Sequence, residues 1–205
     1  MRAVRFNHGS ETVGTGRMTS APPFSVPKTI ALVGLMGAGK SSIGRRLAQV
    51  LALPFTDADA EIEAAAGISI EEIFAREGEA AFRGGERRVL ARLLENPIQV
   101  LATGGGAFMD PETRALIHAR AISIWLRADL DLLLGRVSRR NNRPLLKNGD
   151  PRTILARLIE ERYPVYAEAD LTIDSIDGPP DATLSRVLDA LGKFLGAPAG
   201  IGAAP

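Results

Sequence analysis

A run of residues near the start of the chain has the composition and spacing of a phosphate-binding loop. Residues 34–41 read Gly-Leu-Met-Gly-Ala-Gly-Lys-Ser and fit the pattern G-x-x-x-x-G-K-[ST]. The glycines permit the tight turn that aims several backbone N–H groups at one phosphate, and a helix beginning near Lys40 adds its positive dipole end. The Lys40 ammonium can bridge the β- and γ-phosphates of a nucleotide, and the Ser41 hydroxyl is placed to ligate Mg²⁺. Because an apolar strand precedes the loop and an amphipathic helix follows it, the pattern predicts a nucleotide site rather than a plain glycine turn.

Two carboxylates follow the next predicted strand. Asp57 and Asp59 lie two residues apart after the segment Pro54–Thr56. In a parallel sheet the carboxyl end of this strand lies beside the phosphate loop, where ligands bind. One carboxylate can anchor the water shell of Mg²⁺, and the other can take or orient the proton of an acceptor hydroxyl. The competing interpretation is that one of them, in particular Asp59, only caps the helix that follows.

An arginine and a glutamate at helical spacing form a second charged pattern. Arg83 and Glu86 stand three positions apart, so Glu86 can hold the guanidinium while its fork faces a ligand carboxylate. Taken alone, the pattern is more typical of a surface ion pair. Gly84 and Gly85 lie between the two residues, and each glycine costs up to about 1 kcal/mol relative to alanine in a helix interior. We therefore expect this helix to be frayed or unusually mobile near Arg83.

Three later segments carry residue types that suit an anionic ligand. The triple glycine 104–106 follows the predicted strand Ile98–Thr103 and either exposes bare amides to a substrate or simply forms a turn. The basic, breaker-rich stretch 139–151 is typical of a lid that brings an arginine to a transferring phosphate, or of an exposed basic loop. Arg162 either clamps a carboxylate or places a charge at a helix end, and Pro164 is expected to fix where that helix stops.

These residues need a scaffold, and the apolar pattern of the chain predicts one. Short apolar runs alternate with longer stretches of helical spacing, which favours an α/β fold with a parallel sheet and helices on both faces. No repeat or linker divides the middle of the chain, so we expect one domain. The predicted strands are 29–34, 54–56, 98–103, 121–126 and 171–174, and the predicted helices are 41–53, 60–66, 70–95, 111–119, 129–140, 151–168 and 180–195.

Composition excludes several classes of function. The 205 residues are 45% hydrophobic and 24% charged, which is ordinary for one globular domain. Lys and Arg number 25 against 24 Asp and Glu, so there is no broad basic field for nucleic acid. The chain has no cysteine, which excludes a disulfide scaffold, a zinc–thiolate site and thiol catalysis. No apolar run approaches the ~20 residues that cross a bilayer.

Both ends of the chain are interpreted as tails. Residues 1–28 are polar and rich in turn formers, and we predict a disordered leader, with an organelle transit peptide as the alternative and Met18 as an alternative start. Residues 196–205 are of low complexity and are predicted to be disordered. Nothing identifies a targeting signal, so we predict a cytoplasmic protein, with a plastid location as the alternative.

The class of phosphate-loop protein depends on what else the chain carries. A GTPase would normally have an Asn-Lys-x-Asp guanine reader, and the sequence has none. Its one D-x-x-G match, at 189–192, lies in the last predicted helix, too late to be a switch. A chain of this length also leaves little room for a motor or an effector module. These observations favour a small-molecule kinase.

Taken together, the segments resemble the shikimate kinase family. The motifs that carry the resemblance lie in the family's order over residues 29–195; they are GLMGAGKS at 34–41, DAD at 57–59, GEAAFRGGE at 78–86, TGGG at 103–106, RPLL at 143–146 and ERYPVYAEAD at 161–170. The phosphate loop is shared by many families. The FR-x-x-E pair, the triple glycine and the R-x-P-x-Y ending are together far more specific.

The resemblance implies a fold and an activity. The fold would be a P-loop three-layer sandwich with a five-stranded parallel sheet, as in nucleoside monophosphate kinases, over a domain at 29–195 with a substrate-binding segment at about 59–95 and a lid at about 139–151. The activity would be ATP-dependent phosphorylation of the 3-hydroxyl of shikimate, giving shikimate 3-phosphate and ADP in the route to chorismate and the aromatic amino acids. The partner would be the small-molecule substrate, with no nucleic acid and no membrane, and the protein would be a monomer.

The resemblance also implies roles on the nucleotide side of the site. Lys40 and Ser41 would serve the phosphates and Mg²⁺, with Asp57 near the waters of the metal. Arg136 would stack on adenine, and Arg143 would be the lid arginine that reaches both ligands. The full set of ATP-binding residues would be Gly37, Ala38, Gly39, Lys40, Ser41, Ser42, Arg136 and Arg143.

On the acceptor side, the implied catalytic residue is Asp59, acting with Lys40 and Arg143. Asp59 would bind the ring hydroxyls and position the attacking one or accept its proton. Arg83 and Arg162 would clamp the shikimate carboxylate. The amides of Gly104, Gly105 and Gly106 would line the acceptor site.

Two rival functions remain open on the sequence alone. A related kinase acting on gluconate or a nucleotide shares the phosphate loop, but the FR-x-x-E pair, the triple glycine and Arg162 argue against it. A non-catalytic, kinase-like binding module should have lost Lys40, Asp59 or Arg143, and all three positions hold competent residues.

Overall fold

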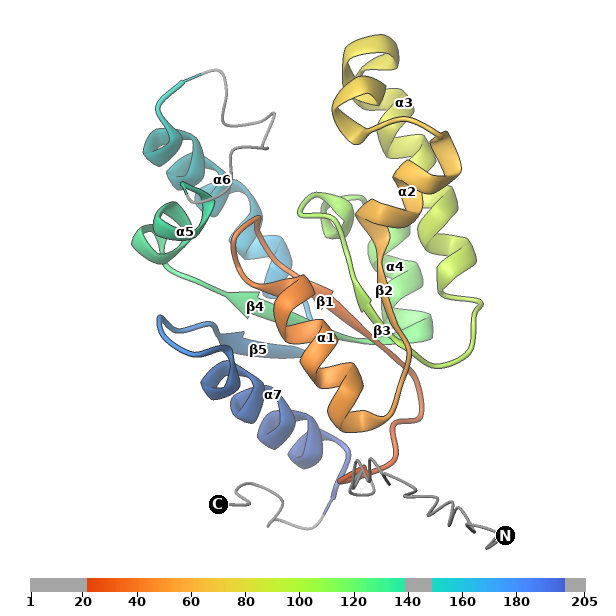
Figure 1. Ribbon diagram of the computed structural model, residues 1–205, viewed down its shortest axis with the longest axis vertical. Coiled ribbons are helices and arrows are strands. Elements are labelled where there is room, and N and C mark those ends of the chain that lie inside the picture. Colours follow the sequence, from red (N-terminus) through yellow and green to blue (C-terminus); the bar gives the residue numbers. More distant parts are fainter. Residues whose placement is uncertain (1–21, 139–148, 198–205) are drawn as a thin grey trace, which may run out of the picture.

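The computed structural model describes residues 22–138 and 149–197, and these form a five-stranded parallel sheet covered by helices on both faces (Figure 1). The strand order is β2-β3-β1-β4-β5, and every pairing is parallel. The strands are β1 (Thr29–Val33), β2 (Phe55–Asp57), β3 (Val100–Ala102), β4 (Ala121–Arg127) and β5 (Leu171–Asp174). The alternating pattern of the sequence therefore predicted the fold class and all five strands.

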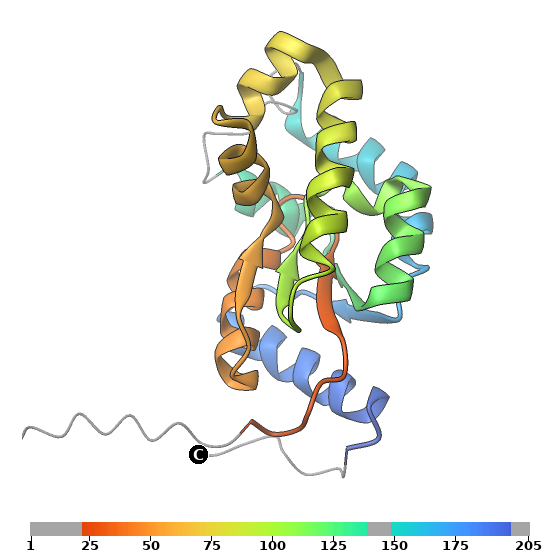
Figure 2. The ribbon, with the colours of Figure 1, turned by 90° about the vertical axis from the view of Figure 1, so that its right-hand side faces the viewer.

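Helices form the two outer layers. The helices are α1 (Lys40–Leu51), α2 (Ala58–Ala66), α3 (Ile70–Leu93), α4 (Pro111–Arg120), α5 (Leu130–Val137), α6 (Pro151–Tyr166) and α7 (Pro180–Phe194), with a short 3-10 turn η1 (Ala107–Met109). Helices α1 and α7 pack together on one face of the sheet, and α4 and α6 lie on the other with η1 between them (Figures 1 and 2). None of the helices described is both long and apolar enough to span a membrane.

Strand β1 is the centre of the core. Its five residues are all buried, as its continuously apolar sequence predicts for a strand covered on both faces. In register, Leu32 of β1 pairs with Ala102 of β3, and Ala102 pairs with Asp57 of β2. The carboxyl ends of these three strands therefore meet at one edge of the sheet, which is where ligands bind in open parallel sheets.

Helix α3 is broken at a different place from the one expected. The chain is helical through Gly84 and Gly85, so the prediction of a helix frayed beside Arg83 was wrong for this structure. The break is at Gly78, whose φ of 80° and ψ of 177° interrupt the helix. This backbone conformation is open essentially to glycine alone. The two parts of α3 stand with α2 as an arm above the sheet (Figure 2).

The arm formed by α2 and α3 has a small apolar cluster of its own. Ile62 of α2 packs with Ile73 and Phe82 of α3, and this cluster is separate from the main core under the sheet. Because the cluster holds α2 against both sides of the Gly78 break, the arm keeps a defined shape despite the interruption.

Two predicted boundaries also differ from the structure. Pro164 does not end its helix, because α6 continues to Tyr166 with Pro164 exposed in its last turn. Because proline has no backbone N–H, the helix loses one hydrogen bond there, close to its end, where the last carbonyls have no partner within the helix in any case. At the start of the chain, the described part of the predicted leader packs on the domain, with Val26 buried in the core and Phe24 against Gly192 of α7.

We expect Gly78→Ala to lower the free energy of unfolding by about 1–3 kcal/mol, since alanine is strained in this backbone conformation. Gly85→Ala is the matched control on the same helix, because a methyl group there meets no other atom within 4 Å. The control should be neutral or stabilising by up to about 1 kcal/mol. Urea denaturation of the full chain measures both values, and equal changes in the two variants would rule out strain at Gly78.

Candidate active site

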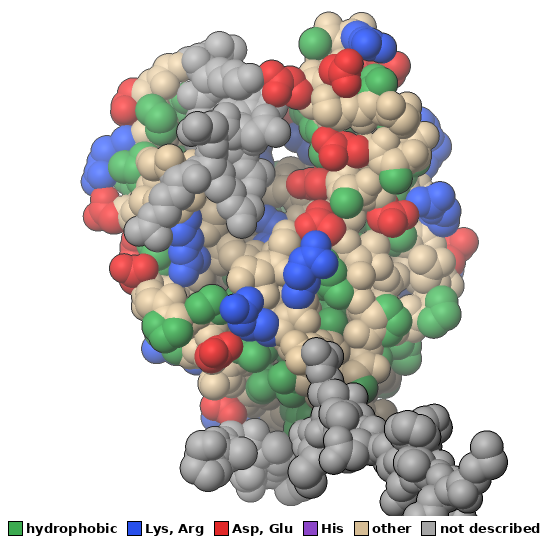
Figure 3. Space-filling view, viewed as in Figure 1, with side chains coloured by type: hydrophobic (Ala, Val, Ile, Leu, Met, Phe, Trp, Pro, Cys, Tyr) green, Lys and Arg blue, Asp and Glu red, His purple; other side chains and the backbone are tan. Residues whose placement is uncertain are grey.

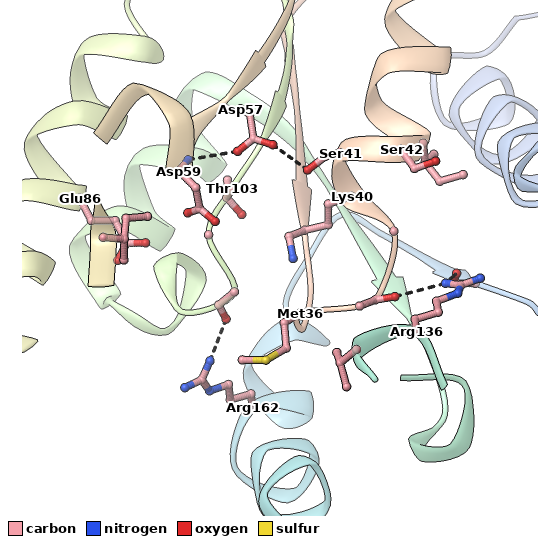
Figure 4. A pocket seen from close by; sticks show the side chains of 18 of the residues that line it. Met36, Lys40, Ser41, Ser42, Asp57, Asp59, Glu86, Thr103, Arg136 and Arg162 are labelled. Atoms are coloured by element: carbon pink, nitrogen blue, oxygen red, sulfur yellow. Dashed lines mark hydrogen bonds between the residues drawn. The ribbon is translucent and has the colours of Figure 1, made fainter. Parts of the chain in front are cut away.

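A cavity of about 710 Å³ opens at the carboxyl edge of the sheet. The phosphate loop lies at its centre, residues from β2 and the α2–α3 arm line one end, and residues from α5, the β5–α7 connection and α7 line the other. Figure 3 shows the surface hollowed beside the α2–α3 arm, and Figure 4 shows side chains from these elements pointing into the cavity. The cavity thus brings together residues that are more than a hundred positions apart in the sequence.

The phosphate loop has the conformation that its sequence predicts. Gly37 and Gly39 have φ angles of 83° and 101°, which close the turn before α1 begins at Lys40. No side chain caps the first turn of α1, so its leading N–H groups face the cavity side of the loop. The Lys40 ammonium donates to the carbonyls of Gly34 (2.7 Å) and Leu35 (3.0 Å). A loop of this kind is suited to hold an anion such as a polyphosphate.

Asp57 connects the phosphate loop to the α2–α3 arm. Its Oδ2 accepts a hydrogen bond from the Ser41 hydroxyl at 2.6 Å, and its Oδ1 accepts one from the Asp59 N–H at 3.2 Å (Figure 4). Asp57 is therefore the residue that caps α2, and the alternative in which Asp59 is the cap is wrong. The Asp59 carboxylate lies in the first turn of α2 and lines the cavity.

The oxygens of Ser41 and Asp57 match the donor set that Mg²⁺ takes in phosphate-loop proteins. Both are hard oxygen ligands, and they are held 2.6 Å apart at the start of α1. Within the described ranges no group of three or more Asp, Glu, His or Cys side chains is placed to enclose a metal ion. Mg²⁺ commonly keeps its waters and binds through one or two protein oxygens and the phosphates of a substrate, so the site fits this ion.

Arg83 and Glu86 form a partly buried ion pair rather than a surface one. Arg83 Nη1 lies 2.6 Å from Glu86 Oε2, and the Glu86 side chain is only 3% exposed. Burial raises the pKa of Glu86, and the bond to Arg83 opposes this shift. Burial also lowers the pKa of Arg83, but the bonds to Glu86 and Glu79 outweigh it, and the net shift is upward. The guanidinium is thus held charged at the edge of the cavity.

The triple glycine provides a backbone surface against which these charged groups pack. A methyl group on Gly104 would lie 2.7 Å from Glu86 Oε1 and 2.8 Å from Asp59 Oδ1, and one on Gly106 would lie 2.5 Å from Arg83 Nη1. Such contacts are too close for any Cβ atom. The charged ends of Glu86, Asp59 and Arg83 would have to move to admit a side chain at Gly104 or Gly106, so the loop does more than turn the chain after β3.

Arg162 of α6 reaches the same glycine loop from the opposite side. Its Nη1 donates to the Gly105 carbonyl at 3.0 Å (Figure 4). The Arg83 and Arg162 guanidiniums therefore both lie against residues 104–106, with the Asp59 carboxylate close to Gly104. Two cations and one carboxylate around bare backbone form a site for a small anion that also carries hydroxyl groups.

Arg136 lies at the other end of the cavity. From α5 it donates to the carbonyls of Gly37 (3.3 Å) and Ala38 (3.4 Å) in the phosphate loop. It also donates to Ser175 Oγ (2.9 Å) and to the Ile176 carbonyl (2.8 Å), which follow β5. Arg136 therefore ties the phosphate loop to the β5–α7 connection. Ala38 is buried and contributes backbone to this contact.

Several cavity residues were not singled out in the sequence. Phe74 and Phe82 of α3 form an aromatic wall, with ring centroids 4.6 Å apart, and Thr103 and Met36 also line the cavity. Phe82 directly precedes Arg83, so its position in the FR-x-x-E motif was the available signal. Ser42 lines the cavity as expected. The remaining predicted site residue, Arg143, lies outside the described residues.

The sequence is similar to proteins named shikimate kinase. A protein-family model described as shikimate kinase matches residues 36–192. The shikimate kinase of Paramagnetospirillum magneticum is 62% identical over 170 residues, which cover 83% of this chain and 87% of that protein. The shikimate kinase of Caulobacter vibrioides is 62% identical over 164 residues, covering 80% of this chain and 82% of that protein.

Solved structures agree with the sequence comparison. Shikimate kinase from Acinetobacter baumannii in complex with shikimate has a TM-score of 0.78 and 39% identity, covering 82% of this chain and 93% of that one. Shikimate kinase from Aquifex aeolicus has a TM-score of 0.70 and 33% identity, covering 82% of this chain and 99% of that one. The parallel sheet and phosphate loop are those of the nucleoside monophosphate kinase-like fold. This match in sequence, fold and motif order shows that the chain belongs to the shikimate kinase family.

Proposed function

We propose that the residues of this site transfer the γ-phosphoryl group of ATP to the 3-hydroxyl of shikimate, which is the activity of the family. The observation that carries this assignment is the grouping of Arg83, Arg162 and Asp59 around the glycine loop next to Lys40. A cyclic acid with hydroxyl groups needs cations for its carboxylate and an acceptor for its hydroxyls, and this end of the cavity provides both.

On the acceptor side, the two arginines hold the carboxylate of the substrate. Arg83 is fixed by Glu86 and Arg162 by the Gly105 carbonyl, so each presents its remaining N–H donors without a large loss of side-chain entropy. The amides of Gly104, Gly105 and Gly106 line the site. Asp59 accepts a hydrogen bond from the attacking hydroxyl and orients that oxygen or takes its proton.

On the nucleotide side, the loop amides of Gly37, Ala38 and Gly39 and the Lys40 ammonium bind the phosphates. Ser41 and Asp57 would hold Mg²⁺, Asp57 through a water; when bound, the ion neutralises charge on the β- and γ-phosphates. Ser42 and Arg136 complete the nucleotide contacts, with Arg136 beside adenine. Lid closure by Arg143 is proposed from the sequence alone.

The transfer itself requires positioning more than covalent help from the protein. The acceptor oxygen forms a bond to the γ-phosphorus, the bond to the β–γ bridging oxygen breaks, and ADP leaves with that oxygen. The proton of the hydroxyl passes to Asp59 or through it to solvent. Lys40 stabilises charge on the transferred group.

A substrate panel tests the function against its nearest rivals. The purified chain should release ADP with shikimate and not with gluconate or a nucleoside monophosphate, because only shikimate presents a carboxylate on a ring of hydroxyls to the two arginines. Turnover of gluconate instead would identify the related sugar-acid kinase. Binding of ATP and shikimate by calorimetry without turnover would identify a non-catalytic module. The monomeric state and the cytoplasmic location stay predictions.

We expect Asp59→Asn to lower kcat by about 10²–10⁴-fold, the range of general acid–base contributions. The amide keeps the size of the side chain but cannot take the proton. Asp189→Asn is the control, since Asp189 is an exposed carboxylate on α7 outside the cavity. A coupled ADP-release assay measures both variants, and full activity of the Asp59 variant would contradict the assigned role.

We expect Arg83→Ala to raise the KM for shikimate at least about tenfold, because a charge-assisted bidentate contact is lost. The KM for ATP should stay within about twofold, since ATP binds at the other end of the cavity. Arg76→Ala is the control, because Arg76 is an exposed arginine of the same helix, paired with Glu72. Steady-state kinetics with each substrate varied in turn checks the result; equal rises in both KM values would refute the clamp.

A further inference from the structure

One backbone carbonyl in the acceptor loop receives two side-chain hydrogen bonds from a single helix. The Gly105 oxygen accepts from Arg162 Nη1 at 3.0 Å and from the Tyr166 hydroxyl. Arg162 and Tyr166 are one turn apart on α6, so their side chains lie on the same face of the helix. Gly105 is also close to the phosphate loop, since a methyl group on it would lie 3.4 Å from the Met36 nitrogen. Gly105 is therefore the residue at which α6, the acceptor loop and the phosphate loop meet.

Tyr166 is held in place by the core. Its side chain is fully buried, and its ring packs 5.9 Å from the Trp125 ring and 6.4 Å from that of Phe108, measured between centroids. Burial raises the pKa of Tyr166 to about 12, and the nearby charge of Arg162 acts in the opposite direction. At neutral pH the phenol therefore keeps its proton and acts as a donor to Gly105. A fixed ring with a fixed donor is a rigid support for the loop.

We propose that Tyr166 is a positioning residue for the carboxylate clamp. Its hydroxyl donates to the Gly105 carbonyl oxygen and fixes the position of that oxygen, to which Arg162 Nη1 also donates. The fixed oxygen in turn sets the direction of the remaining N–H donors of Arg162. Tyr166 does not line the cavity, so it would act through Gly105 and Arg162. This proposal rests on the proposed function of the site, since the clamp is defined by the shikimate carboxylate.

Tyr163 offers a matched control on the same helix. Its hydroxyl also donates to a backbone carbonyl, that of Ala128, and its ring packs edge-on against Trp125 at 4.9 Å. Ala128 lies between β4 and α5, and Tyr163 lines a separate, smaller cavity with Arg127 and Asp129. Removing this hydroxyl deletes the same kind of bond at a half-buried position away from the acceptor loop.

The test compares Tyr166→Phe with Tyr163→Phe in the full chain. Tyr166→Phe should raise the KM for shikimate about five- to tenfold, the effect of losing one hydrogen bond that orders a binding group. Its KM for ATP should change less than about twofold. Tyr163→Phe should change neither value. Equal effects on both substrates, no effect on shikimate, or the same effect in both variants would overturn the proposal.

A double-variant cycle separates positioning from a general loss of stability. In an Arg162→Ala background, the Tyr166→Phe change should no longer raise the KM for shikimate, because the group that it positions is absent. A change that merely loosens the fold would act equally in both backgrounds and would contradict the proposal. If the unaltered chain fails to phosphorylate shikimate, the proposed function fails; if it is active and Tyr166→Phe is without selective effect, only the positioning role fails.

Discussion

The site depends on the shared edge at which β1, β2 and β3 end. Because β1 is buried on both faces and paired on both sides, its end is fixed within the core, and the phosphate loop starts there. The same register places Asp57 at the end of β2 and the triple glycine after β3. Parallel pairing therefore brings the Asp57 carboxylate, the phosphate loop and the triple glycine to one edge of the sheet, although they are far apart in the sequence.

The charged side chains around the glycine loop depend on one another for their stability. Glu86 is almost wholly buried, and a buried carboxylate is costly unless a cation and hydrogen bonds compensate it. Arg83 provides that compensation, and in turn is held in one orientation. One oxygen of Glu86 has no partner among the described residues and lies above Gly104, beside Asp59. These charged side-chain ends occupy the space that a side chain on Gly104 or Gly106 would need, so the glycines there allow the charged groups to approach the backbone.

The sequence patterns predicted the features that depend on residues close together in the chain. Helical spacing was enough to pair Arg83 with Glu86, because residues three apart share a helix face. The prediction that the helix frays at Gly84 and Gly85 was wrong, because the small cost of glycine in a helix is outweighed once the helix is packed. The break at Gly78 depends on a positive φ angle, which the spacing of apolar residues does not reveal. Tyr166 could not be assigned a role, since its partner lies 61 positions away and only the fold brings the two together.

The aromatic group behind the acceptor loop contains the single tryptophan of the chain. Trp125 is buried against Tyr163 and Tyr166, and its ring lies 3.3 Å from where a methyl group on Gly34, the first residue of the phosphate loop, would be. The indole thus lies between Tyr166, which holds the Gly105 carbonyl, and the first glycine of the phosphate loop. Because it is the single tryptophan, its fluorescence reports on this junction alone, with no dye attached to the protein.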